Sequence, residues 1–595
     1  MIFFPLAEAT SLPRVLRRSR MFPAIRNKAL LLATLIAVAC ISAAPARGQG
    51  LQPDEQPSSI RGTVINSVTH APIARALVYT PDNRFAMLTD GEGHFEFPLP
   101  QADTGSGTGI EVFGEPQQPR LYERAGHQFW LLARKPGFLD DPNDRTEASP
   151  GTDVTVSLMP EALIKGRVAL STADAAVGVT VQIFSRQVQE GFPRWLLGTS
   201  VRANSSGEFR FADLPSGAYK LMTHELRDND PVASVPGGQL YGFPPVYYPG
   251  VPDFAAAGTI ELAAGQSVDV DLSLTRQPYF DVKIPVANGE TNGGMNVSVQ
   301  GQRGPGYSLG YNPGEQRIEG MLPNGNYVVE IVTYGQIPAT GMVNLRVAGA
   351  PVEGPSMTLT RNSSIRLNVK EEFSDLNQNI SGTWADGKRT WALHGPRLYL
   401  QARVEPVDDG EQNRGGSPRP PTGPNDDSLV LENLAPGRYW LRLNSSRGYV
   451  ASATMGAVDL LHEPLVVGPG ADTPIEIKMR DDTAEIDGTV TTIAATRPAS
   501  GETTEPSSPQ AWVYCVPLPD SLGQFQQLAV SADGKFLSPS MAPGSYQVLA
   551  FAKRQPNLPY RDAEAMRAYD TKGPVIHLAA GQKAAVQVQL ISSSE

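Results

Sequence analysis

Apolar and polar residues alternate in short runs along the chain, a pattern typical of β-strands with one buried face. One run recurs as an opening strand at Ile60–Val64, Ile164–Val168, Phe280–Ile284, Ile365–Val369 and Ile486–Val490. A second run recurs as a closing strand at Val154–Leu158, Val270–Leu274, Met357–Leu359, Ile475–Met479 and Val586–Leu590. Five opening and five closing strands predict five copies of one structural unit.

A turn followed by a tyrosine marks four of these copies. It occurs at Leu214–Tyr219, Leu322–Tyr327, Leu434–Tyr439 and Met541–Tyr546, and the tyrosines are 108, 112 and 107 residues apart. Pro and Gly favour the tight turn, and we expect each tyrosine to fill the core with its ring and to hydrogen-bond through its hydroxyl, as in the tyrosine corner. A period of about 100 residues suits one β-sandwich. The first copy lacks this turn and carries an insertion near 101–126.

Between a closing strand and the next opening strand only five or six residues intervene, at 159–163, 275–279, 360–364 and 480–485. Such short linkers leave little freedom, so we expect a semi-rigid string of modules. Helix is scarce, and the pattern predicts two helical turns at Arg561–Ala568. Pro and Gly concentrate in Gly410–Asp427, which we interpret as a mobile loop of the fourth copy.

Residues 1–48 read as a secretory signal peptide. Arg26 and Lys28 precede the apolar run 29–41, and Ala44-Pro45-Ala46 offers a cleavage site. Residues 1–20 are an upstream extension if the chain starts at Met21 rather than Met1. We expect export across the inner membrane to the periplasm, cell surface or medium, with no transmembrane span in the mature chain. A lipoprotein anchor at Cys40 is the less favoured alternative.

The net charge and the cysteine content limit which classes of function the sequence supports. The formal net charge is −11, and removal of the basic leader makes the remainder more acidic, which disfavours binding to nucleic acid. Only Cys40 and Cys515 are present, so cleavage of the leader leaves no internal disulfide. Cys515 lies in a predicted strand, where we expect a small buried side chain rather than a reactive thiol.

A family resemblance rests on motifs that occur in order. The first copy has Ile60-x-Gly-x-Val64, Thr89-Asp90-x-x-Gly-x-Phe95-x-Phe97 and Pro136-Gly-Phe138, and the second adds Gly207-Glu-Phe209. These resemble the carboxypeptidase regulatory-like domain, a transthyretin-like sandwich that is also grouped with carbohydrate-binding-like folds. The similarity covers most of residues 57–592, with the third and fourth copies matching in outline only.

The resemblance implies an all-β, tandem array of about five transthyretin-like or immunoglobulin-like Greek-key β-sandwich modules. Their predicted ranges are 57–160, 161–276, 277–361, 362–480 and 481–595. It also implies an extracytoplasmic accessory role without catalysis, because the chemistry of the name-giving enzymes lies in a separate zinc domain.

Motifs for chemistry are weak. None of the seven histidines begins an H-x-x-E or H-E-x-x-H pattern, so we expect no metal and no cofactor. Gly306–Gly310 matches G-x-S-x-G around Ser308, but the glycines and prolines on both sides exclude the strand and helix that this motif needs. Asp90, Asp533 and Asp228 are oxygen ligands that calcium accepts, with turn formation as the favoured alternative. We therefore predict no catalytic residue.

Aromatic residues in loops are the candidates for ligand binding. The second copy carries Tyr241, Phe243, Tyr247 and Tyr248 in one loop, and the fourth carries Trp384 and Trp391 in an insertion. Exposed rings of this kind stack on sugars; the alternative is that they pack the loop onto the sandwich. We predict a non-catalytic protein that binds a polysaccharide, a cell-envelope glycan or an envelope protein. The alternative is a structural adhesin or spacer that binds protein partners.

Overall fold

The computed structural model describes residues 59–591, apart from 83–84, 99–128, 142–144, 150, 229–237, 289–293, 335–337, 375–381, 387–388, 394, 409–414, 424–425, 492–510, 520, 522 and 532, and the side chains of 381–394. The predicted signal peptide, Cys40 and both candidate start sites lie outside the described residues. We number the repeated units modules 1 to 5 after their predicted ranges; the boundaries themselves stay a prediction.

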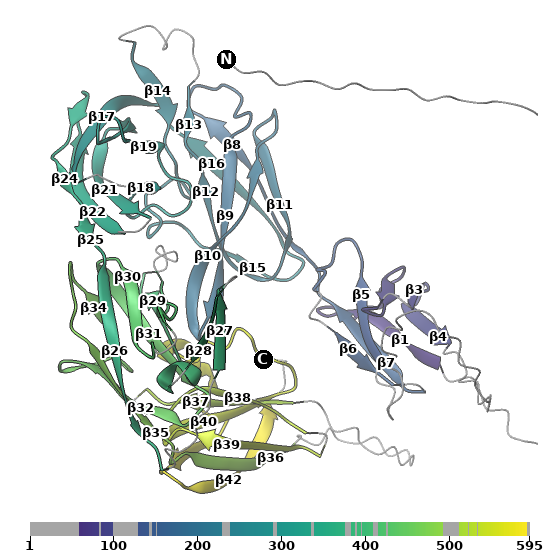
Figure 1. Cartoon of the computed structure of the whole chain (residues 1–595). Helices are drawn as coiled ribbons and strands as arrows, with labels where there is room; N and C mark the ends of the chain where they lie inside the picture. Colours follow the sequence, from purple (N-terminus) through teal and green to yellow (C-terminus); the bar gives the residue numbers. More distant parts are fainter. Residues whose placement is uncertain are drawn as a thin grey trace, which may run out of the picture. The chain divides into compact units, whose positions relative to one another are not determined.

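Nearly all of the regular secondary structure in the described chain is β-strand, arranged as a succession of small β-sandwiches (Figure 1). The strands of module 1 are β1 (Ser59–Asn66), β2 (Leu77–Tyr79), β3 (Ala86–Leu88), β4 (His94–Pro98), β5 (Phe129–Arg134), β6 (Thr146–Ala148) and β7 (Asp153–Leu158). Its two sheets have the orders β4-β1-β7 and β3-β2-β5-β6. The opening strand β1 and the closing strand β7 pair in parallel, although they are separated by most of the module.

Module 2 repeats this arrangement. Its strands are β8 (Ala162–Leu170), β9 (Thr180–Gln189), β10 (Phe192–Arg202), β11 (Glu208–Leu214), β12 (Gly217–Thr223), β13 (Leu226–Arg227), β14 (Leu240–Phe243), β15 (Ile260–Leu262) and β16 (Ser267–Leu274). The orders β11-β8-β16 and β10-β9-β12-β15 match those of module 1 strand for strand. Here too, the opening and closing strands β8 and β16 are parallel neighbours.

Modules 3 and 4 keep the parallel pairing of the predicted opening and closing strands but add extra strands. Module 3 contains β17 (Gln277–Ala287), β18 (Met295–Val299), β19 (Leu309–Asn312), β20 (Arg317–Pro323), β21 (Gly325–Thr333), β22 (Ala339–Val347), β23 (Val352–Glu353), β24 (Met357–Thr358) and β25 (Thr360–Arg361). Module 4 contains β26 (Ser363–Glu372), β27 (Gly382–Asp386), β28 (Arg389–Leu393), η2 (Gly395–Leu398), β29 (Leu400–Pro406), β30 (Leu429–Leu434), β31 (Gly437–Ser445), β32 (Tyr449–Met455), β33 (Val458–Asp459), β34 (Leu465–Val467) and β35 (Ile475–Arg480).

Module 5 closes the array with the same first-to-last pairing, between β36 and β42. Its elements are β36 (Ala484–Thr491), β37 (Trp512–Pro517), β38 (Gln526–Ala529), β39 (Lys535–Met541), β40 (Gly544–Phe551), α1 (Ala563–Met566), η4 (Arg567–Tyr569), β41 (Val575–Leu578) and β42 (Lys583–Ile591). The helical segment predicted at Arg561–Ala568 is confirmed as α1 followed by η4. Asp562 caps α1 by accepting the N–H groups of Glu564 and Ala565.

The repeated glycine of the opening strand has a steric cause. Gly62, Gly166 and Gly488 each pair directly with a phenylalanine of the neighbouring antiparallel strand. A Cβ atom on Gly166 would lie 1.8 Å from the carbonyl oxygen of Val270 on the parallel strand and 2.9 Å from the Phe209 ring. The sequence motifs Ile-x-Gly-x-Val and Gly-x-Phe are therefore two halves of one contact, in which the ring lies over a position that has no room for a side chain.

The expected tyrosine corner is confirmed in all four copies that carry the turn. The hydroxyls of Tyr219, Tyr327, Tyr439 and Tyr546 donate to the carbonyl oxygen four residues earlier, at 2.6, 2.9, 2.8 and 2.6 Å. Each bond ties the start of a strand to the turn before it. The predicted all-β fold of tandem sandwiches is thus built from one set of local rules, and each sandwich encloses a separate hydrophobic core.

The described part of the proline-rich segment, residues 415–423 and 426–427, is held by backbone bridges and side-chain bonds, and its predicted mobility stays a prediction. Residues Gly416 and Pro418 bridge to Val404 and Leu431. Asp426 accepts hydrogen bonds from Arg419 and from the backbone and hydroxyl of Thr422. These bonds fasten the segment to its module, which composition could not reveal.

Candidate functional site

The aromatic loop of module 2 mostly faces inwards. Phe243 is part of the module core and Tyr247 is fully buried. The Tyr247 hydroxyl donates to the carbonyl of Arg303 at 2.9 Å and accepts its N–H at 2.8 Å, and burial raises the pKa of Tyr247 to about 12. A ring with no exposed face cannot stack on a sugar. The arrangement of these two residues is the loop packing that we weighed against binding.

Tyr241 and Tyr248 keep part of their surface, but they do not form a shared platform with the two buried rings. The guanidinium of Arg276 lies 4.2 Å from the centre of the Tyr241 ring and bonds to Asp228 at 2.7 Å. Tyr248 packs on the module 2 core. Asp228 therefore forms a salt bridge with Arg276.

Trp384 and Trp391 stand opposite each other in the backbone register of the β27–β28 hairpin. Their side chains lie outside the described residues. Their proposed role in glycan binding stays a prediction.

Ser308 has a structural role in this chain. No helix follows it; instead it precedes strand β19, and its hydroxyl donates to the Glu225 carboxylate at 2.9 Å. Its carbonyl accepts a bond from Arg227. Glu225 belongs to module 2 and Ser308 to module 3, so the G-x-S-x-G segment fastens two modules together.

The remaining sequence candidates for chemistry are also held in structural contacts. Asp90 accepts the N–H groups of Glu92 and His94, the turn role that we favoured over calcium binding. Cys515 is confirmed as buried, and burial raises the pKa of its thiol to about 12. Over the part of the chain that the structure describes, no group of three or more His, Cys, Asp or Glu is placed to hold a metal ion. Within the same residues, no helix is long and apolar enough to cross a membrane.

The most developed polar and aromatic site lies where the β9–β10 hairpin meets modules 4 and 5. The two-residue turn Glu190-Gly191 has positive φ at both positions, 50° and 80°, as a tight hairpin requires. After the turn, Phe192 stacks on Trp440 of β31, with ring centres 5.5 Å apart and planes 19° apart. The hairpin tip of module 2 thus contacts a strand of module 4.

Glu405 of β29 is the centre of a charged network beneath this stack. It accepts contacts from Arg403 at 2.8 Å, Arg442 at 3.2 Å and Arg194 at 3.5 Å. Arg194 belongs to the hairpin, and its side chain is only 7% exposed. Removal of one partner of such a buried pair leaves the other charge buried without its partner, which is energetically costly. This contact therefore constrains the position of the hairpin strongly.

Burial and pairing act in opposite directions on the arginines of this network. Burial lowers the pKa of Arg442, although the charge of Glu405 works against it. For Arg403, burial is outweighed by its hydrogen bond to Glu190 and by the charges of Glu405 and Glu190, so its pKa is raised. Both guanidinium groups stay positively charged, and Arg442 lies 5.2 Å from the centre of the Phe192 ring.

A second aromatic pair completes the site from module 5. Tyr560 stacks on Phe525 with centres 3.7 Å apart and planes 8° apart. The Tyr560 ring also touches Gly191, where a Cβ atom would lie 2.8 Å from it. These groups line a cleft of about 1180 Å³ that offers rings and guanidinium groups for recognition.

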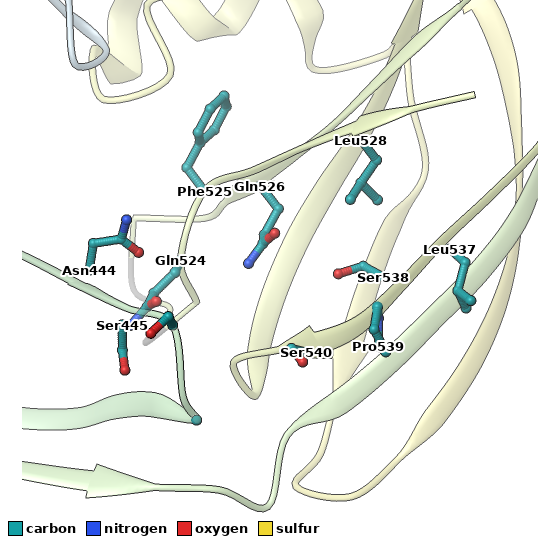
Figure 2. Close-up of a pocket in the computed structure, with 12 residues that line it drawn as sticks. Asn444, Ser445, Gln524, Phe525, Gln526, Leu528, Leu537, Ser538, Pro539 and Ser540 are labelled. Atoms are coloured by element: carbon teal, nitrogen blue, oxygen red, sulfur yellow. The ribbon is translucent and has the colours of Figure 1, made fainter. Parts of the chain in front are cut away.

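A smaller, polar hollow of about 330 Å³ lies between modules 4 and 5. Figure 2 shows Asn444, Ser445 and Gln524 close together on one side and Ser538 on the other. Its lining side chains offer amide and hydroxyl groups but no ionisable side chain. The hollow is therefore suited to water or a small polar group rather than to chemistry.

Sequence reasoning missed the hairpin site. Trp440 lies in a strand pattern, which by itself predicts packing within its own sandwich, and no sequence motif includes Phe192. The signal that could have found the hairpin was the Glu-Gly turn between two long strand patterns. Nothing in the sequence pointed to its docking on Trp440, because the two residues belong to different modules.

Comparisons with known proteins give fold-level neighbours only. No protein-family model matches the chain, and no curated protein matches its sequence. Among solved structures, the TIE protein of Bacillus anthracis is 8% identical over 71% of this chain and 68% of its own, with a TM-score of 0.14. The full-length RrgB pilus protein of Streptococcus pneumoniae is 10% identical over 73% and 98%, with a TM-score of 0.14. BcpA, the major pilin subunit of Bacillus cereus, is 10% identical over 54% and 100%, with a TM-score of 0.11. These scores are too low to carry an argument about function.

Proposed function

We propose that the protein is a non-catalytic, extracytoplasmic scaffold that joins its β-sandwich modules into a structural unit and meets protein partners. The observation that carries this proposal is the joint between modules 2 and 3. Strands β13 and β14 leave module 2 and continue the sheet of module 3 in the order β13-β14-β17-β20-β19. A sheet that runs across both modules stiffens their joint, which suits a spacer.

Side-chain contacts support the same joint. Glu225 is 6% exposed and accepts bonds from the Ser308 hydroxyl and N–H. Gln239 bonds to the carbonyl of Tyr279 at 2.8 Å, and Tyr279 is itself buried. The buried Glu225 carboxylate is thus bonded across the joint, which favours one orientation of the two modules because another orientation leaves the carboxylate without these partners.

Membership of the carboxypeptidase regulatory-like family is part of the proposal. It is supported by the shared sheet order of modules 1 and 2 and by the glycine–phenylalanine contact common to modules 1, 2 and 5. Glycan binding is the second candidate. It loses support because Phe243 and Tyr247 are buried, and it now depends on Tyr241, Tyr248, Trp384 and Trp391.

A distance measurement tests the scaffold. Spin labels at Ala175→Cys in module 2 and Ala350→Cys in module 3 of residues 49–595 should give one narrow distance distribution. Ser308→Ala removes one joint bond and should broaden it slightly. A distribution as broad as that of a flexible linker in the unmodified chain would refute the stiff joint.

A binding measurement distinguishes the scaffold proposal from the glycan-binding proposal. Purified residues 49–595 are mixed with insoluble polysaccharides and peptidoglycan, next to a Tyr241→Ala/Tyr248→Ala variant and a Trp384→Ala/Trp391→Ala variant. The scaffold proposal expects no binding that either variant loses. Loss of binding in one variant would instead identify a glycan site at those rings.

A further inference from the structure

The β9–β10 hairpin is longer than its own sandwich needs. Strands β9 and β10 have 10 and 11 residues, yet the buried run of β9 ends at Phe184. The five residues that follow on β9 are exposed or half-buried. The outer half of this hairpin therefore contributes little to the core of module 2, and its contacts lie elsewhere.

We propose that the surface formed by Trp440, Arg403 and Tyr560 of modules 4 and 5 is a recognition site for an acidic–glycine–aromatic hairpin tip, and that the chain's own Glu190-Gly191-Phe192 occupies it as a latch at the wall of the cleft. This inference goes beyond the scaffold role and does not depend on it. Residues Ser58–Glu595 form one contact-connected unit, and the latch links modules that are not neighbours in sequence.

Each of the three tip residues meets a different feature of the site. Glu190 forms a salt bridge with Arg403 at 2.8 Å. Phe192 is stacked on Trp440. At Gly191, the carbonyl accepts the N–H of Arg561 at 3.1 Å, and the lack of a side chain lets the Tyr560 ring approach. The site therefore recognises the charge of Glu190, the backbone of Gly191 and the aromatic ring of Phe192 together.

The site is also specific in what it would reject. Any side chain at Gly191 meets the Tyr560 ring, and the positive φ of 80° adds backbone strain. A basic residue at position 190 would face Arg403, with Arg561 also close to the tip. Aromatic, arginine-rich sites of this kind carry most of the binding energy of protein interfaces.

The contact has one exposed and one buried ion pair, and only the exposed pair can be weakened by salt. Glu190 and Arg403 are 46% and 48% exposed, so salt can screen their attraction. The Arg194–Glu405 pair is shielded, and it sets the orientation in which the tip is seated. Opening would uncover Trp440 and Tyr560 for another hairpin tip.

The test uses residues 49–595 with spin labels at Ala175→Cys in module 2 and Lys553→Cys in module 5. Cys515 is buried and stays unlabelled. The unmodified chain should give one narrow distance distribution. Phe192→Ala and Glu190→Arg should each broaden it, and adding Arg403→Glu to Glu190→Arg should restore the narrow peak.

Gln187→Ala is the matched control, because the side chain of this exposed hairpin residue donates to Ser185 of its own strand. It should leave the distribution unchanged. Hydrogen exchange over β8 and β16 shows in each variant whether module 2 stays folded. A broad distribution in the unmodified chain, or a Phe192→Ala distribution identical to it, would overturn the latch.

A peptide tests the recognition site directly. A cyclic peptide with the sequence of residues 186–195 should bind the Phe192→Ala chain at least ten times more tightly than the unmodified chain, whose site is filled. Replacement of Trp440 by Ala in the Phe192→Ala chain should abolish this binding. Equal binding to all three chains refutes the site, and a concentration-dependent dimer of the unmodified chain refutes seating within one chain.

Discussion

Replacement of Tyr546 by Phe tests whether the tyrosine corner stabilises its module. The hydroxyl donates to the carbonyl of Ala542 at 2.6 Å and accepts the N–H of Gln524 at 3.1 Å. Phe keeps the ring and removes only these bonds. Because Tyr546 and Ala542 are buried, the carbonyl is left without a donor in a place that water does not reach. The expected loss is about 1–3 kcal/mol of unfolding free energy.

Native-state hydrogen exchange measures this loss module by module within the whole chain. A loss of about 1–3 kcal/mol corresponds to exchange about 5- to 150-fold faster at the core amides of β36–β42. Modules 1 to 3 should keep their protection. Tyr334→Phe is the control, because this tyrosine is 53% exposed and its change should cost less than about 0.5 kcal/mol. If Tyr546→Phe and Tyr334→Phe have equal effects, the corner is not a stabilising contact.

Three further predictions follow from single contacts. Gly488→Ala places a Cβ atom 2.4 Å from the Val586 carbonyl oxygen and should destabilise module 5 by about 3 kcal/mol, seen as faster exchange there; near-normal protection would show that β36 and β42 can separate without cost. Burial opposes the charge of Asp426, but bonds from Arg419, Ser428 and Thr422 outweigh it and hold the pKa of this carboxyl well below its usual range. Its contribution is therefore complete above about pH 4 and is lost as the pH falls through the lowered pKa, so Asp426→Asn should flatten the decrease of the melting temperature between pH 5 and pH 2.5. Cys515 should react with a thiol reagent only after unfolding in urea, and reaction in the native chain would contradict its burial.

Much of the fold could be predicted from the sequence because the rules that build each sandwich are local. Alternation along Ile60–Val64 specifies which face is buried, and the turn before Tyr219 specifies where the next strand starts. These patterns recur with the same spacing, so each copy strengthens the interpretation of the others. Composition alone did not show the contacts that hold the proline-rich segment to its module.

The candidate site could not be predicted to the same degree. Tyr247 and Tyr248 are adjacent and chemically alike, yet one is fully buried and the other is not. The difference arises because Tyr247 packs against Phe184 and Phe254 of its own module, and its hydroxyl bonds to Arg303 of the next module. A loop aromatic residue is exposed or buried according to what packs on it, and that partner lies outside its own stretch of sequence.

The sequence by itself determined the repeated sandwich, its turns and the glycines and tyrosines that shape it, because those features depend on residues that are close in the chain or on one face of a strand. Only the tertiary structure decided that strand β14 completes the sheet of the next module and that Phe192 meets Trp440. Such contacts join surfaces from separate modules, and alternation in one strand carries no information about the surface that will cover it.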